Sequence, residues 1–114
     1  MSQLKKNQAR SATEISQLEE IIMIALLKRE LYGLQIVKAI DEASGGKRCL
    51  SVGSLYPTLH RMEKNGLIDS FWGDEKSDER GGARRRYYKL TGKGITALNE
   101  AQELRINLTA WQPS

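Results

Sequence analysis

Hydrophobic residues recur at helical spacing in several stretches of the chain. This pattern predicts helices over residues 13–29, 32–43, 51–65 and 92–109. Thr13 is expected to cap the first helix, whose second half is apolar almost all round. Such a helix is buried on several sides, and in so small a chain a second subunit can supply part of that burial.

The third predicted helix has an inner stripe of apolar and aromatic residues. Its members are Val52, Leu55, Tyr56, Leu59 and Met62. Pro57 conflicts with a helix interior, where proline costs about 3 kcal/mol, unless Ser51–Ser54 form the entry to the helix. The helix is expected to stop at Gly66, since glycine accepts the left-handed backbone of a helix exit.

Alternating apolar and polar residues predict strands over residues 67–72 and 84–90. The polar segment 73–83 joins them, which indicates a β-hairpin with a long tip, and residues 48–50 are a candidate short strand. Helix, helix, helix, hairpin, helix is the order of a winged helix-turn-helix, whose later central helix enters the DNA major groove. Many small α+β domains share this order, so the order alone does not decide the function.

Composition narrows the possibilities. The chain has 114 residues and a formal net charge of +4, which favours one domain and a polyanionic partner, although excess lysine without a partner gives the same charge. With Cys49 as the one cysteine and His60 as the one histidine, neither a disulfide within the chain nor a zinc site can form. The polar start and the short apolar run 21–27 predict a cytoplasmic protein with no membrane partner.

Three blocks of sequence carry a more specific signal. Residues 53–68, which read GSLYPTLHRMEKNGLI, resemble the recognition-helix signature of PadR regulators. Tyr32-Gly33 resembles the start of the preceding helix in that family, and residues 86–91 with Gly94 resemble its second wing strand. The resemblance covers about residues 14–101. It implies a homodimeric winged-helix repressor of double-stranded DNA whose terminal helices form the dimer interface.

The resemblance divides the chain into three parts. These are a flexible basic arm (residues 1–11), a winged helix-turn-helix domain (12–91) and a C-terminal dimerisation helix with its tail (92–114). The expected fold is therefore mainly α, of the α+β class. A single helix after the wing is similar to the short PadR subfamily, which puts a large ligand-binding domain in doubt. Within that subfamily the chain resembles the period-extender clock modifiers of photosynthetic bacteria, which implies a role in circadian rhythm.

The candidate DNA contacts are polar residues outside the apolar stripe, basic residues of the wing and two tyrosines near helix starts. Hydroxyl groups can bond phosphates or base edges, and arginine can grip guanine bidentately. A solvated helix face is the alternative, and Arg61 can instead pair with Glu63 or Glu30. His60 is an even choice between contact and ordinary surface. The candidates are Tyr32, Ser54, Tyr56, Thr58, Arg61, Lys64, Arg84 and Arg86.

The last predicted helix presents an apolar seam that is the candidate dimer interface. Its members are Ile95, Leu98, Leu104, Leu108 and Trp111. In drug-responsive PadR relatives, tryptophans near this interface stack on flat ligands, so the resemblance makes Trp111 a candidate site for a small aromatic effector. Packing in the interface is the alternative for Trp111, and core or interface packing is the preferred interpretation of Trp72.

Two other classes of function are open to the sequence. An enzyme lacks support, because the sequence contains no glycine-rich phosphate loop and no HExxH pair, and Cys49 with His60 is a pair by composition only. No cofactor or metal is expected. A winged helix that binds protein instead of DNA is favoured by the acidic wing tip, where residues 74–79 carry several carboxylates. For a DNA-binding protein, this tip is expected to bend away from DNA or to be neutralised by Lys76 and Arg80.

Overall fold

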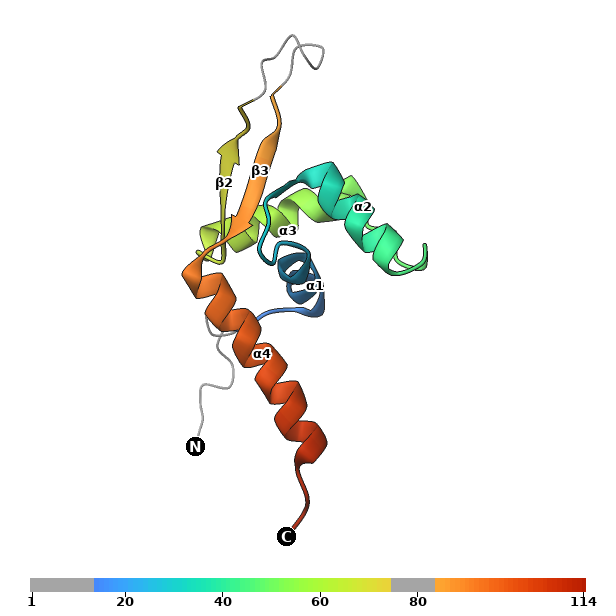
Figure 1. The fold of residues 1–114 in the computed structure, drawn as a ribbon, viewed down its shortest axis with the longest axis vertical. Coiled ribbons are helices and arrows are strands. Elements are labelled where there is room, and N and C mark those ends of the chain that lie inside the picture. The colour runs from blue at the N-terminus through green and yellow to red at the C-terminus, as the bar shows by residue number, and fades with distance from the viewer. Residues whose placement is uncertain (1–13, 75–83) are drawn as a thin grey trace.

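The computed structural model describes residues 14–74 and 84–114, and its elements follow the predicted order (Figure 1). They are α1 (Gln17–Ala25), β1 (Leu31–Tyr32), α2 (Gly33–Ala43), α3 (Val52–Lys64), β2 (Ile68–Trp72), β3 (Arg86–Leu90) and α4 (Gly92–Ala110). The α+β winged-helix fold expected from the sequence is confirmed. Residues 1–13 and the acidic tip at 75–83 lie outside the described residues, and so does the predicted cap Thr13.

The strands form an antiparallel sheet in the order β1-β3-β2. Tyr87 of β3 lies opposite Tyr32 of β1 on one side and Phe71 of β2 on the other. Because side chains alternate along a strand, these rings share one face of the sheet, and Arg86 and Tyr88 share the other. β1 was not predicted as a strand. It joins the chain before α2 to the base of the wing.

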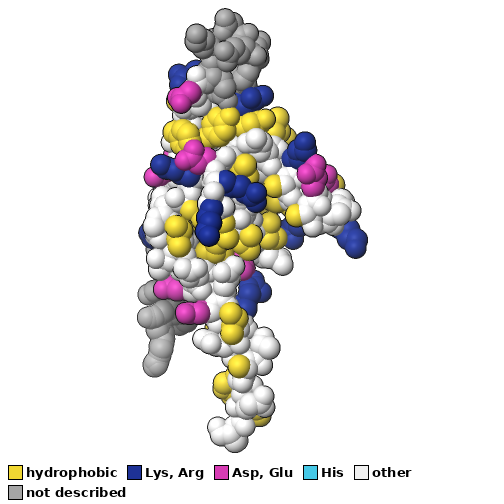
Figure 2. All heavy atoms as spheres, viewed as in Figure 1, with side chains coloured by type: hydrophobic (Ala, Val, Ile, Leu, Met, Phe, Trp, Pro, Cys, Tyr) yellow, Lys and Arg dark blue, Asp and Glu magenta, His cyan; other side chains and the backbone are white. Residues whose placement is uncertain are grey.

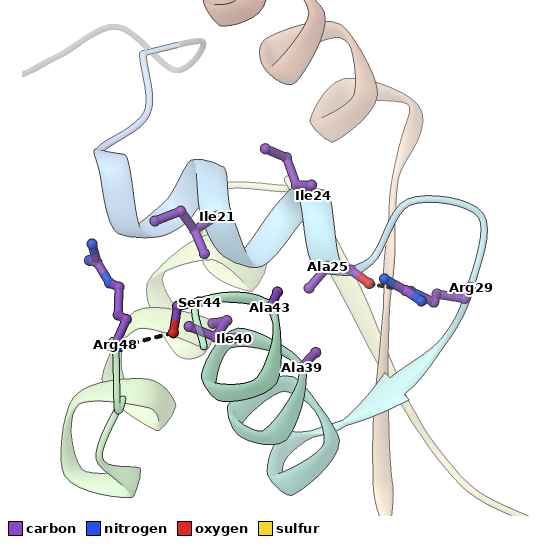
Figure 3. Close-up of a pocket in the computed structure, with 9 residues that line it drawn as sticks. All are labelled: Ile21, Ile24, Ala25, Arg29, Ala39, Ile40, Ala43, Ser44 and Arg48. Atoms are coloured by element: carbon purple, nitrogen blue, oxygen red, sulfur yellow. Dashed lines mark hydrogen bonds between the residues drawn. The ribbon is translucent and has the colours of Figure 1, made fainter. Parts of the chain in front are cut away.

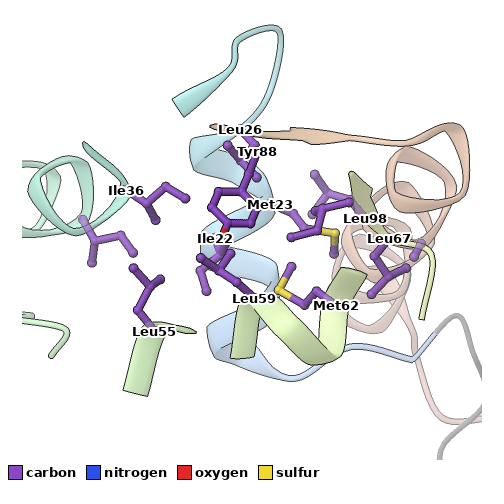
Figure 4. Close-up of a cluster of buried hydrophobic side chains, with 13 residues drawn as sticks. Ile22, Met23, Leu26, Ile36, Leu55, Leu59, Met62, Leu67, Tyr88 and Leu98 are labelled. Atoms are coloured by element: carbon purple, nitrogen blue, oxygen red, sulfur yellow. The ribbon is translucent and has the colours of Figure 1, made fainter. Parts of the chain in front are cut away.

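The hydrophobic core is built around α1 (Figure 4). Ile22 and Met23 of α1 and Leu26, the residue after it, are almost completely buried, and they meet side chains from α2, α3, the wing and α4. The partners whose large side chains are fully buried are Ile36, Leu55, Leu59, Met62, Leu67, Ile68 and Leu98. Burial of this kind stabilises a fold by about 1.5–3 kcal/mol for each large apolar side chain. The core therefore fixes the positions of α3 and the wing relative to each other.

The helix α1 is shorter than predicted. Ser16 caps it, since its hydroxyl accepts a hydrogen bond from the Glu19 amide and the Glu19 carboxylate accepts one from the Ser16 amide. The helix ends at Ala25, and Lys28 turns the chain with a φ of 59°. The strand predicted at residues 48–50 is also wrong, because the structure has no regular element there.

The helix α3 has the predicted length, but its buried stripe is rotated. Leu55, Leu59 and Met62 are buried as expected, whereas Val52 and Tyr56 are exposed. The Ser51 hydroxyl caps the helix by accepting a hydrogen bond from the Ser54 amide. Pro57 lies inside the helix, beyond the entry that was expected to accommodate it. The predicted stop is confirmed at Gly66, whose φ of 80° suits glycine.

The helix α4 packs against the domain through its first half, and one residue of its second half also contacts α1. Thr91 caps it and also donates a hydrogen bond to the Gly66 carbonyl over 2.6 Å, which ties the helix start to the turn after α3. Further along, the Arg105 guanidinium donates to both carboxylate oxygens of Glu20 on α1, over 2.6 and 3.2 Å. The outer half of α4, residues 103–110, runs away from the domain and is exposed throughout (Figure 1).

Candidate nucleic-acid interface

The helix α3 presents one buried side to the core and one exposed, polar side to solvent. We call the exposed side the α3 face, and it consists of Ser54, Tyr56, Pro57, His60, Arg61 and Lys64. At 100° per residue these positions form a continuous arc opposite Leu55, Leu59 and Met62. The face carries hydroxyl, imidazole, guanidinium and ammonium groups on a rigid helix. Such groups can bond both phosphates and base edges.

Tyr56 is held at the edge of the α3 face by the start of α2. Its ring packs so closely over Gly33 that a Cβ atom there would overlap the Tyr56 hydroxyl. A larger residue at position 33 would displace the Tyr56 ring, and this close approach of α2 and α3 explains the glycine after Tyr32. The Tyr56 side chain remains 42% exposed, so part of its ring still faces solvent.

A groove of about 570 Å³ separates α3 from the wing. Tyr56, His60, Glu63 and Lys64 line it from the helix, and Arg86 and Tyr88 line it from β3. The Arg86 guanidinium lies 5.1 Å from the centre of the Trp72 ring and 3.8 Å from the Glu63 carboxylate. Burial raises the pKa of Tyr88, which keeps its hydroxyl neutral at the inner wall.

The wing arginines do not share one role. Arg84 precedes β3 instead of belonging to it, and its guanidinium donates to the Gly73 carbonyl over 3.3 and 3.0 Å. The predicted alternation places Arg85 on the opposite face from Arg86, and this is confirmed, because Arg85 lies 4.4 Å from the centre of the Tyr32 ring. Only Arg86 among these three residues lines the groove.

The opposite face of the sheet is aromatic. Tyr32 meets Tyr87 edge-on at 5.4 Å, Tyr87 stacks on Phe71 at 5.8 Å, and the Lys89 ammonium lies over Phe71 at 5.7 Å. Figure 2 shows hydrophobic side chains gathered across this part of the molecule, with basic groups beside them. Tyr32 is thus on the other side of the sheet from the groove, and the structure does not bring it together with the α3 face.

The prediction that Thr58 lies on the exposed side of α3 is wrong. Its side chain is only 4% exposed, because Thr58 follows Leu55 by three residues and precedes Met62 by four, which places all three on one side of the helix. Its hydroxyl donates to the Ser54 carbonyl over 2.9 Å and accepts from Arg61 over 3.3 Å. Thr58 therefore anchors the Arg61 guanidinium and cannot itself reach a DNA groove.

The described residues hold no cluster of His, Cys, Asp and Glu that could bind a metal ion. Cys49 donates its thiol hydrogen to Asp41 over 3.3 Å, and this hydrogen bond with the Asp41 charge raises the pKa of Cys49. A raised pKa makes a cysteine a poorer nucleophile at neutral pH. Within residues 14–74 and 84–114, no helix has the length and apolarity needed to cross a bilayer.

Comparison with known proteins identifies the family to which this chain belongs. The sequence model of the PadR-like transcriptional regulators matches residues 22–100, from the middle of α1 to the first half of α4. The chain belongs to the PadR-like family. Members are transcriptional regulators, so regulation through DNA binding is the function at its coarsest level, and such proteins are not normally enzymes.

Solved structures support the same family. A PadR-like transcription factor from Bacteroides fragilis is 33% identical, with 82% of this chain and 84% of that chain covered and a TM-score of 0.71. A transcriptional regulator from Clostridium thermocellum is 32% identical, covering 81% and 84% with a TM-score of 0.69. A PadR family regulator from Clostridium difficile is 33% identical, covering 83% and 94% with a TM-score of 0.65. A curated relative, an uncharacterised protein of Lysinibacillus sphaericus, is 29% identical over 73% of this chain and 72% of its own length.

The PadR family match ends just before the outer half of α4. Of the apolar seam predicted there, Leu98 is only 1% exposed and belongs to the core of its own chain, so it cannot contact a second chain and its assignment is wrong. Ile95 is exposed where α4 begins. The outer half of α4 and the residue after it carry large exposed apolar side chains, namely Leu104, Ile106, Leu108 and Trp111.

A second apolar surface of this PadR-like chain is a hollow of about 300 Å³ between α1 and α2 (Figure 3). It is lined by Ile21, Ile24, Ala25, Arg29, Ala39, Ile40, Ala43, Ser44 and Arg48. The Arg29 side chain is tied back to the Ala25 carbonyl over 2.7 Å. The hollow lies on α1, the helix for which the sequence analysis expected a second subunit to supply part of the burial.

Sequence reasoning missed the residues that shape the groove. Trp72 was expected in the core or an interface. The core alternative is wrong, because Trp72 is exposed and its ring lies beneath Arg86. Glu63 was considered only as a partner of Arg61, whereas it contacts the wing. The alternation in β2 and β3 could have shown that Ser70, Trp72, Arg86 and Tyr88 share a face. The contact between this face of the sheet and the last turn of α3 depends on tertiary packing, which the sequence pattern does not show.

Proposed function

We propose that this PadR-like regulator is a cytoplasmic repressor that binds an inverted-repeat operator as a homodimer. In this proposal the α3 face enters the major groove and Arg86 contacts the backbone beside it. The observation that carries the proposal is the α3 face itself, a rigid polar and basic surface whose opposite side is locked into the core. Bound protein would repress by excluding RNA polymerase from the promoter.

The contact set follows from exposure. Ser54, Arg61 and Lys64 are exposed on the α3 face, and Tyr56 is half-exposed at its edge. Base edges would be read by Ser54 and Arg61, while Lys64 and Tyr56 would hold phosphates. Arg84 supports the wing through Gly73 and would reach the backbone only if it left that carbonyl, so it is secondary to Arg86. Tyr32 is proposed only as a contact at the base of the wing.

Two chains are proposed to join through the outer half of α4. Leu104 and Leu108 are exposed on one side of this half of the helix, and a lone helix with such side chains gains by burying them against a second copy. A twofold dimer presents two α3 faces, and these read successive major grooves when they lie about 34 Å apart. The operator would then be an inverted repeat whose half-sites are one helical turn apart.

The first experiment is selection of bound duplexes from a random pool by the purified chain, followed by mapping of the enriched sequence to the genome. An inverted repeat with half-sites about 10 base pairs apart is expected. Enrichment of no sequence, together with no binding to any duplex at low salt, would refute the proposal. A winged helix that binds protein instead of DNA would behave in that way.

A second experiment tests the α3 face directly. Lys64→Ala should reduce the slope of log K against log salt by about 0.9 for each phosphate that Lys64 neutralises, because each neutralised phosphate releases counterions. Lys38→Ala is the matched control, since Lys38 is an exposed lysine of α2 that pairs with Glu42 over 4.0 Å. Equal effects of the two substitutions would show that Lys64 binds no phosphate of its own.

The dimer is tested by Leu104→Asp, which places a charge in the proposed seam. Sedimentation or light scattering should show a monomer. Operator affinity should fall steeply, because a monomer can contact only one half-site of the operator. Leu104 is exposed in the protomer, so the substitution leaves the core intact. A dimer that persists would move the interface to another surface, with the hollow between α1 and α2 the first to examine.

A small aromatic effector is proposed to act beside the dimer seam. Trp111 follows the end of α4 and is 66% exposed, so its indole is available to stack on a flat ligand. Titration of planar aromatic compounds should quench Trp111 fluorescence in a Trp72→Phe background and release the operator. Quenching without release would mean that the bound compound is not an effector.

A further inference from the structure

We infer that Glu63 is a specificity-determining residue that withholds Arg86 from DNA until the duplex fits the groove. This inference rests on the proposed function, because it concerns the same groove between α3 and the wing. Glu63 would lower the affinity for random DNA more than the affinity for the operator. The discrimination between the two would therefore depend on an acidic residue that faces DNA.

The contacts of Glu63 bridge the helix and the wing. Glu63 lies in the last turn of α3, and its side chain is 36% exposed. Its Oε2 atom accepts a hydrogen bond from the Ser70 hydroxyl of β2 over 2.6 Å, and the same atom lies 3.8 Å from the Arg86 guanidinium of β3. One carboxylate oxygen thus faces both wing strands.

Arg86 is held from two sides. The Glu63 carboxylate attracts its guanidinium, and the Trp72 ring lies 5.1 Å away with its electron-rich face available. Among the described residues that line the groove, Glu63 supplies the one carboxylate, whereas Lys64 and Arg86 supply the positive charge. A phosphate entering the groove must therefore compete with Glu63 for Arg86.

Competition between Glu63 and phosphate for Arg86 lowers the affinity for random DNA more than the affinity for the operator. Affinity for random duplexes comes essentially from phosphate contacts, so a cation that is already paired contributes less to that sum. Affinity for the operator also comes from base contacts, which require α3 and the wing to stay in a fixed relation. The bridge from Glu63 to Ser70 and Arg86 maintains that relation. Specificity is a difference of affinities, and a repulsive group that acts mainly on the wrong partner increases it.

The test measures the affinity of the full chain for the selected duplex and for a scrambled duplex of the same length. Glu63→Gln keeps an oxygen that can accept from Ser70 but removes the charge that holds Arg86. Random-duplex affinity should rise several-fold, operator affinity should rise less, and the salt slope for random DNA should steepen by about 0.9 per protomer. Glu100→Gln is the matched control, because it removes the same charge from an exposed position on α4.

A double-mutant cycle shows whether Glu63 acts through Arg86. Arg86→Gln alone should lower operator affinity more than random affinity, and Glu63→Gln should then have little further effect on random DNA. Should Glu63→Gln fail to fold, Glu63→Asp is measured instead. It keeps the charge but shortens its reach to Arg86, so random-duplex affinity should again rise, and no rise would overturn the inference.

Two results would overturn the inference. One is an equal change in random-duplex affinity for Glu63→Gln and Glu100→Gln. The other is a gain that persists in the Arg86→Gln background. A wild-type chain that binds no duplex refutes the proposed function instead, so the two failures are distinguishable.

Discussion

Substitution of Gly33 by alanine tests the packing that positions the α3 face. Gly33 is the first residue of α2, and a Cβ atom there would lie 2.7 Å from Cζ and 3.0 Å from Cε1 of Tyr56, besides overlapping the hydroxyl. Because these atoms belong to one side chain that is 42% exposed, the Tyr56 ring can swing outward, and the backbone of α3 need not move.

The magnitude follows from two opposing terms. Overpacking costs about 1–3 kcal/mol, and the cost should lie at the low end because Tyr56 can move. Replacing glycine by alanine in a helix returns at most about 1 kcal/mol. Gly33→Ala should therefore lower the free energy of unfolding by at most about 1 kcal/mol, and the comparison with the Tyr56→Ala background isolates the clash. In a Tyr56→Ala background the clash is gone, and the same substitution should become neutral or stabilising.

Urea unfolding of the four proteins in this cycle provides the measurement. Gly92→Ala is the matched control, since Gly92 is the first residue of α4 and a Cβ atom there would meet open space. It should be neutral or slightly stabilising. Operator affinity should also fall in Gly33→Ala, because Tyr56 leaves its place at the edge of the α3 face. If Gly33→Ala changes stability equally with and without Tyr56, the packing argument is refuted.

Three further outcomes are expected. Arg105→Met should lower the free energy of unfolding in urea, because it leaves the nearly buried Glu20 carboxylate without its partner, whereas a substitution at the exposed Glu103 should not. The free energy of unfolding should decrease as pH rises above about 10, because the pKa of Tyr88 is raised only in the folded chain and the unfolded chain loses this proton first. Urea unfolding of Tyr88→Phe over the same pH range should show a smaller decrease. Alkylation of Cys49 by iodoacetamide at pH 8 should be slower than that of free cysteine and faster in Asp41→Ala; equal rates would contradict the role of Asp41 in raising the Cys49 pKa.

The order of elements could be predicted from the sequence because helices and strands impose different periods on their apolar residues. The two-residue strand β1 is too short to show a period, and it exists because Leu31 and Tyr32 pair with Tyr88 and Tyr87 far along the chain. The early end of α1 is also a tertiary effect. The chain turns at Lys28 to bring β1 to the sheet.

The candidate site could be predicted only as far as helical spacing allows. Spacing alone places Thr58 with Leu55 and Met62, but the prediction followed polarity, and polarity failed because the Ser54 carbonyl satisfies the hydroxyl of Thr58 inside the structure. Leu98 was assigned to the seam because one apolar stripe ran through all of α4. Spacing cannot show that the domain covers the first half of that helix and leaves the second half exposed.

The proposed dimer through the outer half of α4 would make the regulator sensitive to its own abundance. A chain without a second copy would keep Leu104 and Leu108 in water, so assembly would be favoured only above a threshold concentration set by mass action. Below that threshold, occupancy of an operator that needs two chains falls with the square of the chain concentration. A modest change in synthesis or degradation of the protein then produces a larger change in transcription.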